Sequence, residues 1–100
     1  FDKNKMEKIL HCVRAHRCKD VMPETIEAKI IACVDSASHF TEMVHVRMAK
    51  YRGEDMAMEK LERDYRDISA FPEVKKMLSE IYKLSKKLIL EYKKFRKVLN

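Results

Sequence analysis

Four stretches of the chain carry apolar side chains at the three- and four-residue spacing of an amphipathic helix. The first covers residues 3–15, and its apolar positions are Met6, Ile9, Leu10 and Val13. Asp2 and Asn4 both have side chains that can accept a hydrogen bond from the first free amides of a helix. The pattern therefore predicts a helix over 3–15, capped by one of these two residues.

The second stretch begins after Pro23 and continues to about Tyr51, where Gly53 ends it. Its first half has little polar surface, because the apolar positions are Ile26, Ala28, Ile30, Ile31, Ala32, Cys33 and Val34. We expect this half to be buried. The pattern predicts one long helix that Thr25 or its neighbours open, and a kink near 36–38 is the alternative to a straight helix.

The remaining two stretches cover 54–68 and 72–99. The shorter has Met58, Leu61, Tyr65 and Ile68 on one face. The longer has a stripe made of Val74, Leu78, Ile81, Leu84, Leu88, Tyr92, Phe95 and Leu99. This stripe is close to a coiled-coil seam and could pack along the domain or against a second copy. The fold class predicted is therefore all-α: a bundle of about four helices, of which the second and the last are long.

Composition supports this prediction and narrows the functions. The 100 residues include one Gly and two Pro, too few for the turns of an all-β fold and for a glycine-rich phosphate loop. There is no run of about 18 apolar residues, so no membrane partner is expected. Three cysteines cannot pair completely, and free thiols are typical of the cytoplasm. The chain starts with Phe1, and we expect it to be a piece of a longer protein.

The formal net charge of +6 belongs to one segment. Residues 71–100 hold nine Lys and Arg against three Asp and Glu, whereas 1–70 hold thirteen of each. A basic helix can contact phosphate or an acidic partner, although a solvated face is the plainer interpretation. No set of aromatic residues is interleaved with the lysines, so a nucleic-acid partner is not expected.

Several polar residues could carry chemistry. Asp35 interrupts an apolar helix, where an unpaired carboxylate is costly; it therefore needs a cation, hydrogen-bond donors or a metal. His39 lies four residues later on the same face and could share a metal or a hydrogen bond with it. His16 and Arg17 together suit phosphate recognition. His45 is expected to face solvent.

Two ordered motifs resemble the second half of HD-domain metal-dependent phosphohydrolases. Residues 27–35 read E-A-K-I-I-A-C-V-D, similar to the family's run E-A-K-I-(apolar)-x-x-A-D, with Val34 where Ala is usual. Residues 9–17 read I-L-H-C-V-R-A-H-R, similar to the family's I-x-x-C-I-x-x-H-R. The intervening Pro23-Glu24-Thr25 also fits. The resemblance covers about 1–50.

The resemblance implies roles for individual residues. Asp35 would be the last ligand of a divalent metal (Mn, Mg, Fe or Ni). His16 would be a catalytic residue that faces the metal cleft, and Arg17 and Lys29 would contact substrate phosphate. His11 is a looser substrate-binding candidate. The family's first His and its His-Asp pair are absent from this chain, so the isolated chain could lack the metal altogether.

The function implied is hydrolysis of nucleotides or other phosphate esters, with the metal activating water. This chain would be an inactive fragment: 1–52 the carboxyl-terminal part of an HD-like domain, and 53–100 a helical extension with a basic last helix. Expected partners are a phosphorylated small molecule or nucleotide and either the missing amino-terminal half or further copies. The alternative is a helical interaction or dimerisation module without catalysis.

Overall fold

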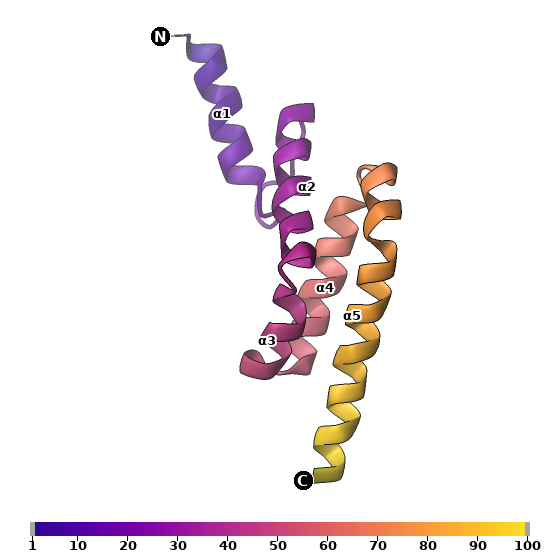
Figure 1. Ribbon diagram of the computed structural model, residues 1–100. Helices are drawn as coiled ribbons and strands as arrows, with labels where there is room; N and C mark the ends of the chain where they lie inside the picture. Colours follow the sequence, from indigo (N-terminus) through magenta and orange to yellow (C-terminus); the bar gives the residue numbers. More distant parts are fainter. Residues whose placement is uncertain (1, 100) are drawn as a thin grey trace.

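The computed structural model describes residues 2–99, and every regular element in that range is a helix (Figure 1). The five helices are α1 (Lys3–Ala15), α2 (Ile26–Thr41), α3 (Val44–Arg52), α4 (Glu54–Ile68) and α5 (Pro72–Leu99). The predicted all-α bundle is confirmed, with five helices instead of about four. None of the helices in the described range has the length and apolar character needed to cross a membrane.

The additional helix arises because the predicted long second helix is broken. Glu42 closes α2 by donating its backbone N–H to Ser38, and Met43 then adopts a left-handed conformation with φ of 56°. Residues other than Gly and Asn seldom adopt this conformation, and the sequence around Met43 therefore did not predict it. The prediction of one continuous helix to about 51 is therefore wrong, and the break lies after the expected kink at 36–38.

The other helix ends follow their sequence signals. Asp2 accepts hydrogen bonds from the backbone N–H groups of Asn4 and Lys5, and Thr25 caps α2 through the N–H of Ala28. Gly53 joins α3 to α4 with φ of 94°, a conformation that a side chain would strain. These caps fix where α2 and α4 begin.

The core lies where α2, α3, α4 and α5 meet. It is formed by the buried side chains of Cys33, Phe40, Ala49, Ala57, Leu61, Ile68, Leu78 and Ile89. Tyr65 of α4 stacks on Tyr82 of α5 with ring centroids 3.7 Å apart, which joins the last two helices at the edge of the core. Residues before and after 52 therefore contribute to one core.

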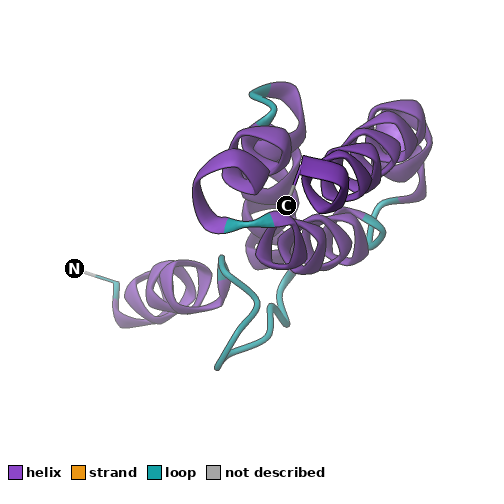
Figure 2. Ribbon diagram, turned by 90° about the horizontal axis from the view of Figure 1, so that it is seen from below, coloured by secondary structure: helices purple, strands orange, loops and turns teal. Residues whose placement is uncertain are grey.

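Helix α1 stands apart from this core. Among the described helices it contacts α2 alone, and Figure 2 shows it projecting away from the other four. Small buried side chains let the two helices approach: Cys12 and Ala15 on α1, Ala28 and Ala32 on α2. The alanine face of α2 is thus the packed one.

The expectation that the first half of α2 is buried as a whole is wrong for this chain. Four of its large side chains are 45–63% exposed, namely Ile26, Ile30, Ile31 and Val34. The neighbouring face of α1 is similarly exposed through Met6, Ile9, Leu10 and Val13. These eight exposed apolar residues are called the α1–α2 face below.

Candidate functional site

A polar pocket of about 260 Å³ lies between the segment after α1, the middle of α2, and α4. Its lining is almost entirely charged or polar and consists of His16, Arg17, Lys19, Asp35, Ser36, His39, Lys60, Arg63, Asp64 and Asp67. Four of the candidate residues named from the sequence line this one pocket: His16, Arg17, Asp35 and His39. The return of the chain from α1 to α2 brings the two motifs together.

His16 ends α1 in a defined orientation. Its Nδ1 lies within hydrogen-bond distance of the Val13 carbonyl oxygen, and since a carbonyl can only accept, Nδ1 must carry the proton. In the neutral ring this leaves Nε2 as an acceptor. The imidazole at the pocket edge can therefore accept a proton or a hydrogen bond from a bound molecule.

His11 lies outside the pocket. Its Nε2 accepts a hydrogen bond of 2.9 Å from the backbone N–H of Glu24, which ties the segment before α2 back to α1. This contact braces the return loop that carries Arg17 and Lys19. The structure therefore gives His11 a place in the support of the pocket, at a distance from its lining.

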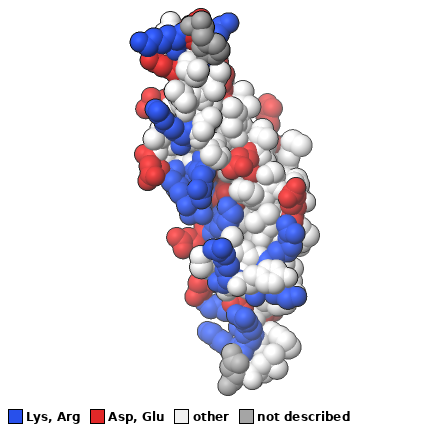
Figure 3. Space-filling view, turned by 90° about the vertical axis from the view of Figure 1, so that its left-hand side faces the viewer, with Lys and Arg blue, Asp and Glu red and all other residues white. Residues whose placement is uncertain are grey.

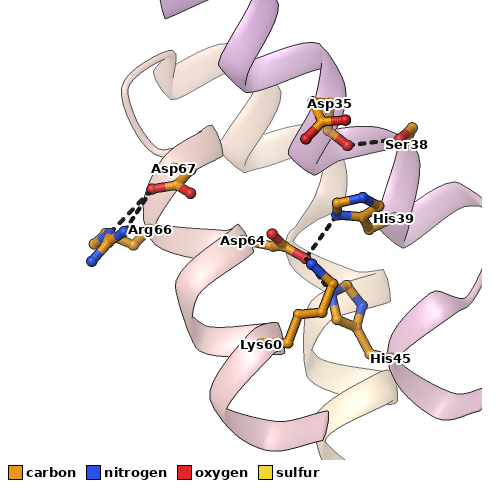
Figure 4. A network of polar contacts seen from close by, with 8 residues as sticks. All are labelled: Asp35, Ser38, His39, His45, Lys60, Asp64, Arg66 and Asp67. Atoms are coloured by element: carbon orange, nitrogen blue, oxygen red, sulfur yellow. Dashed lines mark hydrogen bonds and ion pairs between the residues drawn. The ribbon is translucent and has the colours of Figure 1, made fainter. Parts of the chain in front are cut away.

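Asp35 has a carboxylate without an ionic partner. No Lys, Arg or His in residues 2–99 lies within 4.0 Å of its carboxylate oxygens, and the nearby Ser38 hydroxyl donates to the Asp35 backbone carbonyl (Figure 4). The residue is half-buried on the pocket wall. The salt bridge considered for Asp35 is thus not made by any part of the chain that the structure describes.

A second carboxylate, Asp64, is fully engaged. One of its oxygens, Oδ2, lies 3.0 Å from Nδ1 of His39, 2.7 Å from Nε2 of His45 and 3.4 Å from Nζ of Lys60 (Figure 4). Burial favours the neutral acid and would raise the pKa of Asp64. The hydrogen bond from His45 and the nearby side chains of Lys60 and His39 outweigh that effect, and the pKa is lowered. Asp64 is therefore ionised and acts as an acceptor.

The network orients His39. Because an ionised carboxylate only accepts, Nδ1 of His39 carries the proton that it donates to Asp64, and the opposite nitrogen remains for the pocket that the ring lines. His45 belongs to the same network through its contact with Asp64. The expectation that His45 faces solvent is wrong: it is 1% exposed and its ring packs 4.7 Å from Phe40.

The charges that remain without a partner give the pocket its character. Lys60 is paired with Asp64, and Asp67 is paired with Arg66 at 3.0 Å. Within residues 2–99, no salt bridge engages Arg17, Lys19 or Arg63. Three free cations against one free carboxylate favour a small anion with several acceptor oxygens.

Lys29 lies in a different hollow, of about 240 Å³, which it shares with Cys18, Ala32, Arg66 and other residues. Cys18 forms no disulfide, and neither do the other two cysteines, as expected. Burial and then the Asp67 carboxylate raise the pKa of the Cys18 thiol, and burial raises that of Cys33. Thiols with raised pKa values are poor nucleophiles at neutral pH.

The pocket does not contain a complete metal site. Across residues 2–99 no three His, Cys, Asp or Glu side chains are grouped so that they could hold a metal ion. The Asp35 carboxylate and the second ring nitrogen of His39 could each bind a metal ion, but a stable site needs more ligands than these two. The residues described here therefore do not by themselves fit the divalent metal that the resemblance implies.

Asp64, Lys60 and Arg63 belong to neither motif and were not predicted as site residues. One signal was available: Asp64 falls three residues after Leu61 and four before Ile68, on the buried face of α4. A carboxylate on an apolar face needs partners from another helix. Neither Lys60 nor Arg63 carries a comparable signal, because both resemble ordinary surface positions of a charged helix.

Comparison with protein-family models, curated proteins and solved structures gives no match to this chain. The resemblance to HD-domain enzymes therefore depends on the two motifs.

Proposed function

We propose that this chain is the carboxyl-terminal part of an HD-type phosphohydrolase and supplies the phosphate-binding side of its active site. The substrate is a nucleotide or another phosphate ester, and the site is in the cytoplasm, where three unpaired cysteines are normal. The observation that carries the proposal is the polar pocket, because it unites His16 and Arg17 of one motif with Asp35 of the other.

The charge arrangement supports a phosphate ligand. Arg17 and Arg63 offer planar donors that match phosphate oxygens, and Lys19 adds a third positive charge. Asp35 opposes a bare anion, since like charges repel. A free carboxylate beside free cations suits a site in which a cation also binds. Its other ligands, the family's His and His-Asp pair, would have to come from outside these 100 residues.

The histidines support proton transfer at the same place. His39 is oriented by Asp64, which leaves its second nitrogen for the pocket, and His16 presents Nε2 at the pocket edge. Either imidazole can accept a proton from water or give one to a leaving oxygen near neutral pH. This chain thus contributes phosphate contacts and proton carriers.

A binding experiment tests the phosphate side with the chain alone. In a titration with inorganic phosphate followed by amide NMR, the largest shifts are expected at Arg17, Lys19 and Arg63. Arg17→Ala should weaken binding several-fold, because a charge-assisted contact is lost. Lys97→Ala removes the same charge at the far end of α5 and should leave binding unchanged. Shifts confined to the lysines of α5 would contradict the proposal.

An activity experiment tests the enzyme itself. A longer protein that carries the His and His-Asp motifs ahead of this chain should hydrolyse a phosphate monoester in the presence of Mn²⁺. Asp35→Ala should abolish this activity, while Asp55→Ala, a change of the same kind on the exposed start of α4, should preserve it. Full activity in the Asp35→Ala protein would overturn the assignment of Asp35.

A further inference from the structure

The predicted coiled-coil stripe on α5 packs on the core only at its first two positions, Val74 and Leu78. The face of α5 that packs on the core carries Leu78, Ser85 and Ile89. One flank of that face leaves six large side chains 37–68% exposed: Ile81, Leu84, Leu88, Tyr92, Phe95 and Leu99. They continue beyond the rest of the bundle, where the end of α5 extends freely (Figure 1). This α5 stripe is a raised apolar ridge.

An apolar groove runs beside the α5 stripe. A hollow of about 290 Å³ has Phe40, Met43 and Val46 on one wall and Ile81, Leu84 and Leu88 on the other. A second hollow, of about 430 Å³, shares Val46 and continues between Tyr51 of α3 and Tyr92 of α5. Ridge and groove lie side by side on one surface, so a second copy turned by a two-fold rotation can place its ridge in this groove and receive the other.

The charges at the edges of this surface are also self-complementary. The α3 edge carries Arg47 and Lys50. With about 100° of rotation per residue, Glu80 and Glu91 fall on the opposite edge of the α5 stripe, together with Lys87. Within α5, Glu80 pairs with Lys83 at 3.5 Å and Glu91 with Lys94 at 3.4 Å. A two-fold rotation brings this edge toward Arg47 and Lys50, where the two carboxylates can exchange these weak exposed pairs for pairs across the interface.

Most of the positive charge of α5 lies away from the α5 stripe. The lysines on the other side of the helix are Lys83, Lys86, Lys93, Lys94 and Lys97. Lys86 and Lys93 form ion pairs with α4, and Lys83 and Lys94 form exposed pairs with Glu80 and Glu91 of α5 itself. In Figure 3 basic side chains gather toward the end where α5 terminates, next to uncharged surface. An acidic partner would engage the lysine side and leave the α5 stripe uncovered.

The amount of exposed surface matches the need for a partner. The chain exposes 7427 Å², whereas a compact monomer of this mass exposes about 6,000 Å². Its radius of gyration is 16.1 Å, against about 13 Å for a compact domain of 100 residues. A standard interface covers about 800 Å² on each partner. The excess of about 1,400 Å² is larger than one such interface requires.

We propose that the α5 stripe and the adjoining α3–α5 groove bind the same surface of a second copy of this chain with two-fold symmetry. The inference does not depend on the phosphate pocket, which lies on another side of α2 and α4. Loss of one therefore leaves the other intact.

The test is the mass of the full chain in solution, measured by sedimentation equilibrium over a wide concentration range. A dimer is expected, and Leu88→Asp should weaken self-association at least tenfold. Leu90→Asp is the matched control: Leu90 is 43% exposed against 39% for Leu88 but lies on the lysine side. It should leave the dissociation constant within twofold. Circular dichroism checks that each variant keeps its helices.

Charge-reversal variants, which touch only exposed side chains, test the pairing itself. Arg47→Glu with Lys50→Glu should weaken the dimer, as should Glu80→Lys with Glu91→Lys. Mixing the two double variants should restore a heterodimer. A monomer at every concentration would overturn the proposal, and so would a dimer that survives Leu88→Asp but is lost with Val34→Asp. Binding of a monomeric chain to anionic lipid vesicles, abolished by Leu88→Asp, would assign the α5 stripe to a membrane surface instead.

Discussion

The polar pocket and the α3–α5 groove are hollows of similar size on one helical bundle, about 260 and 290 Å³, with opposite chemistry. In the pocket, buried Asp64 holds several donors, while Arg17 and Asp35 remain free. In the 290 Å³ hollow of the groove, no charged side chain among residues 2–99 lines the walls. A set of free charges can recognise a small ion, whereas an apolar groove gains free energy only from broad coverage. The two hollows therefore call for different kinds of ligand.

The largest expected effect on stability is at Asp64, the buried residue of the polar pocket. Asp64→Ala leaves His45 and Lys60 without their acceptor, and breaking a buried charged pair costs about 3–5 kcal/mol. Asp64→Ala should therefore lower the free energy of unfolding by about 3 kcal/mol, the lower end of this range, because Lys60 and His39 are partly exposed and can be hydrated. Urea unfolding followed by circular dichroism measures the change.

The matched change for this experiment is Asp55→Ala. Asp55 also accepts from a lysine, Lys93, at 2.7 Å, but it lies on the surface, where solvent and salt screen an ion pair. The loss of stability should therefore be much smaller than for Asp64→Ala. Equal losses in the two variants would mean that the Asp64 network does not stabilise the fold.

The second prediction compares the packed face of α5 with the α5 stripe. Ile89 is fully buried on the packed face, and Ile89→Ala should lower the free energy of unfolding by about 2–4 kcal/mol through lost burial and a cavity. Leu84 is 65% exposed, and Leu84→Ala should change the stability of the monomer by about 0.5 kcal/mol or less. Unfolding is measured on the Leu88→Asp background, so that dimer dissociation does not contribute. A similar loss in both variants would place Leu84 in the core.

The two regions also differ in how far the sequence predicts them. The bounds of three helices, α1, α4 and α5, follow from periodicity, caps and Gly53, because these signals are local. The break at Met43 does not, since no residue there favours a left-handed conformation. The same is true of the partners of Asp64, which come from α2 and α3 and meet only in the folded chain.

The site follows the same division. Asp35, His16 and Arg17 could be named from their motifs, and they do share a pocket, although their roles in catalysis stay predictions. Lys29 and His11 lie elsewhere because helix periodicity turns Lys29 away from Asp35 and the return loop occupies His11. The sequence predicts the α5 stripe but not its exposure. The face of α5 that packs on the core includes Ser85, which does not belong to the apolar pattern.

The third prediction is a dependence on pH that arises at the pocket floor. The pKa of Asp64 is lower in the folded chain than its ordinary value, since His45, Lys60 and His39 stabilise the charged form. Its contribution to stability is complete above about pH 4, the ordinary pKa of Asp, and is lost as the pH falls through the folded value. Unfolding measured between neutral and acidic pH should show this loss.

Asp64→Asn supplies the comparison for the acid titration, because it keeps the shape of the side chain and removes the titrating group. Its stability should fall less steeply with decreasing pH than that of the unchanged chain. Parallel curves for the two proteins would assign the acid sensitivity to other carboxylates.

The smallest expected effect on stability is at Arg17, where a loss of phosphate binding should occur without a loss of stability. Arg17 is exposed, and no salt bridge engages it within residues 2–99; Arg17→Ala should therefore change the free energy of unfolding by about 0.5 kcal/mol or less. The same substitution should weaken phosphate binding several-fold, so the two measurements must diverge on one variant. If Arg17→Ala instead lowered stability as much as Asp64→Ala, Arg17 would be part of the supporting network, and its free charge could not be assigned to a ligand.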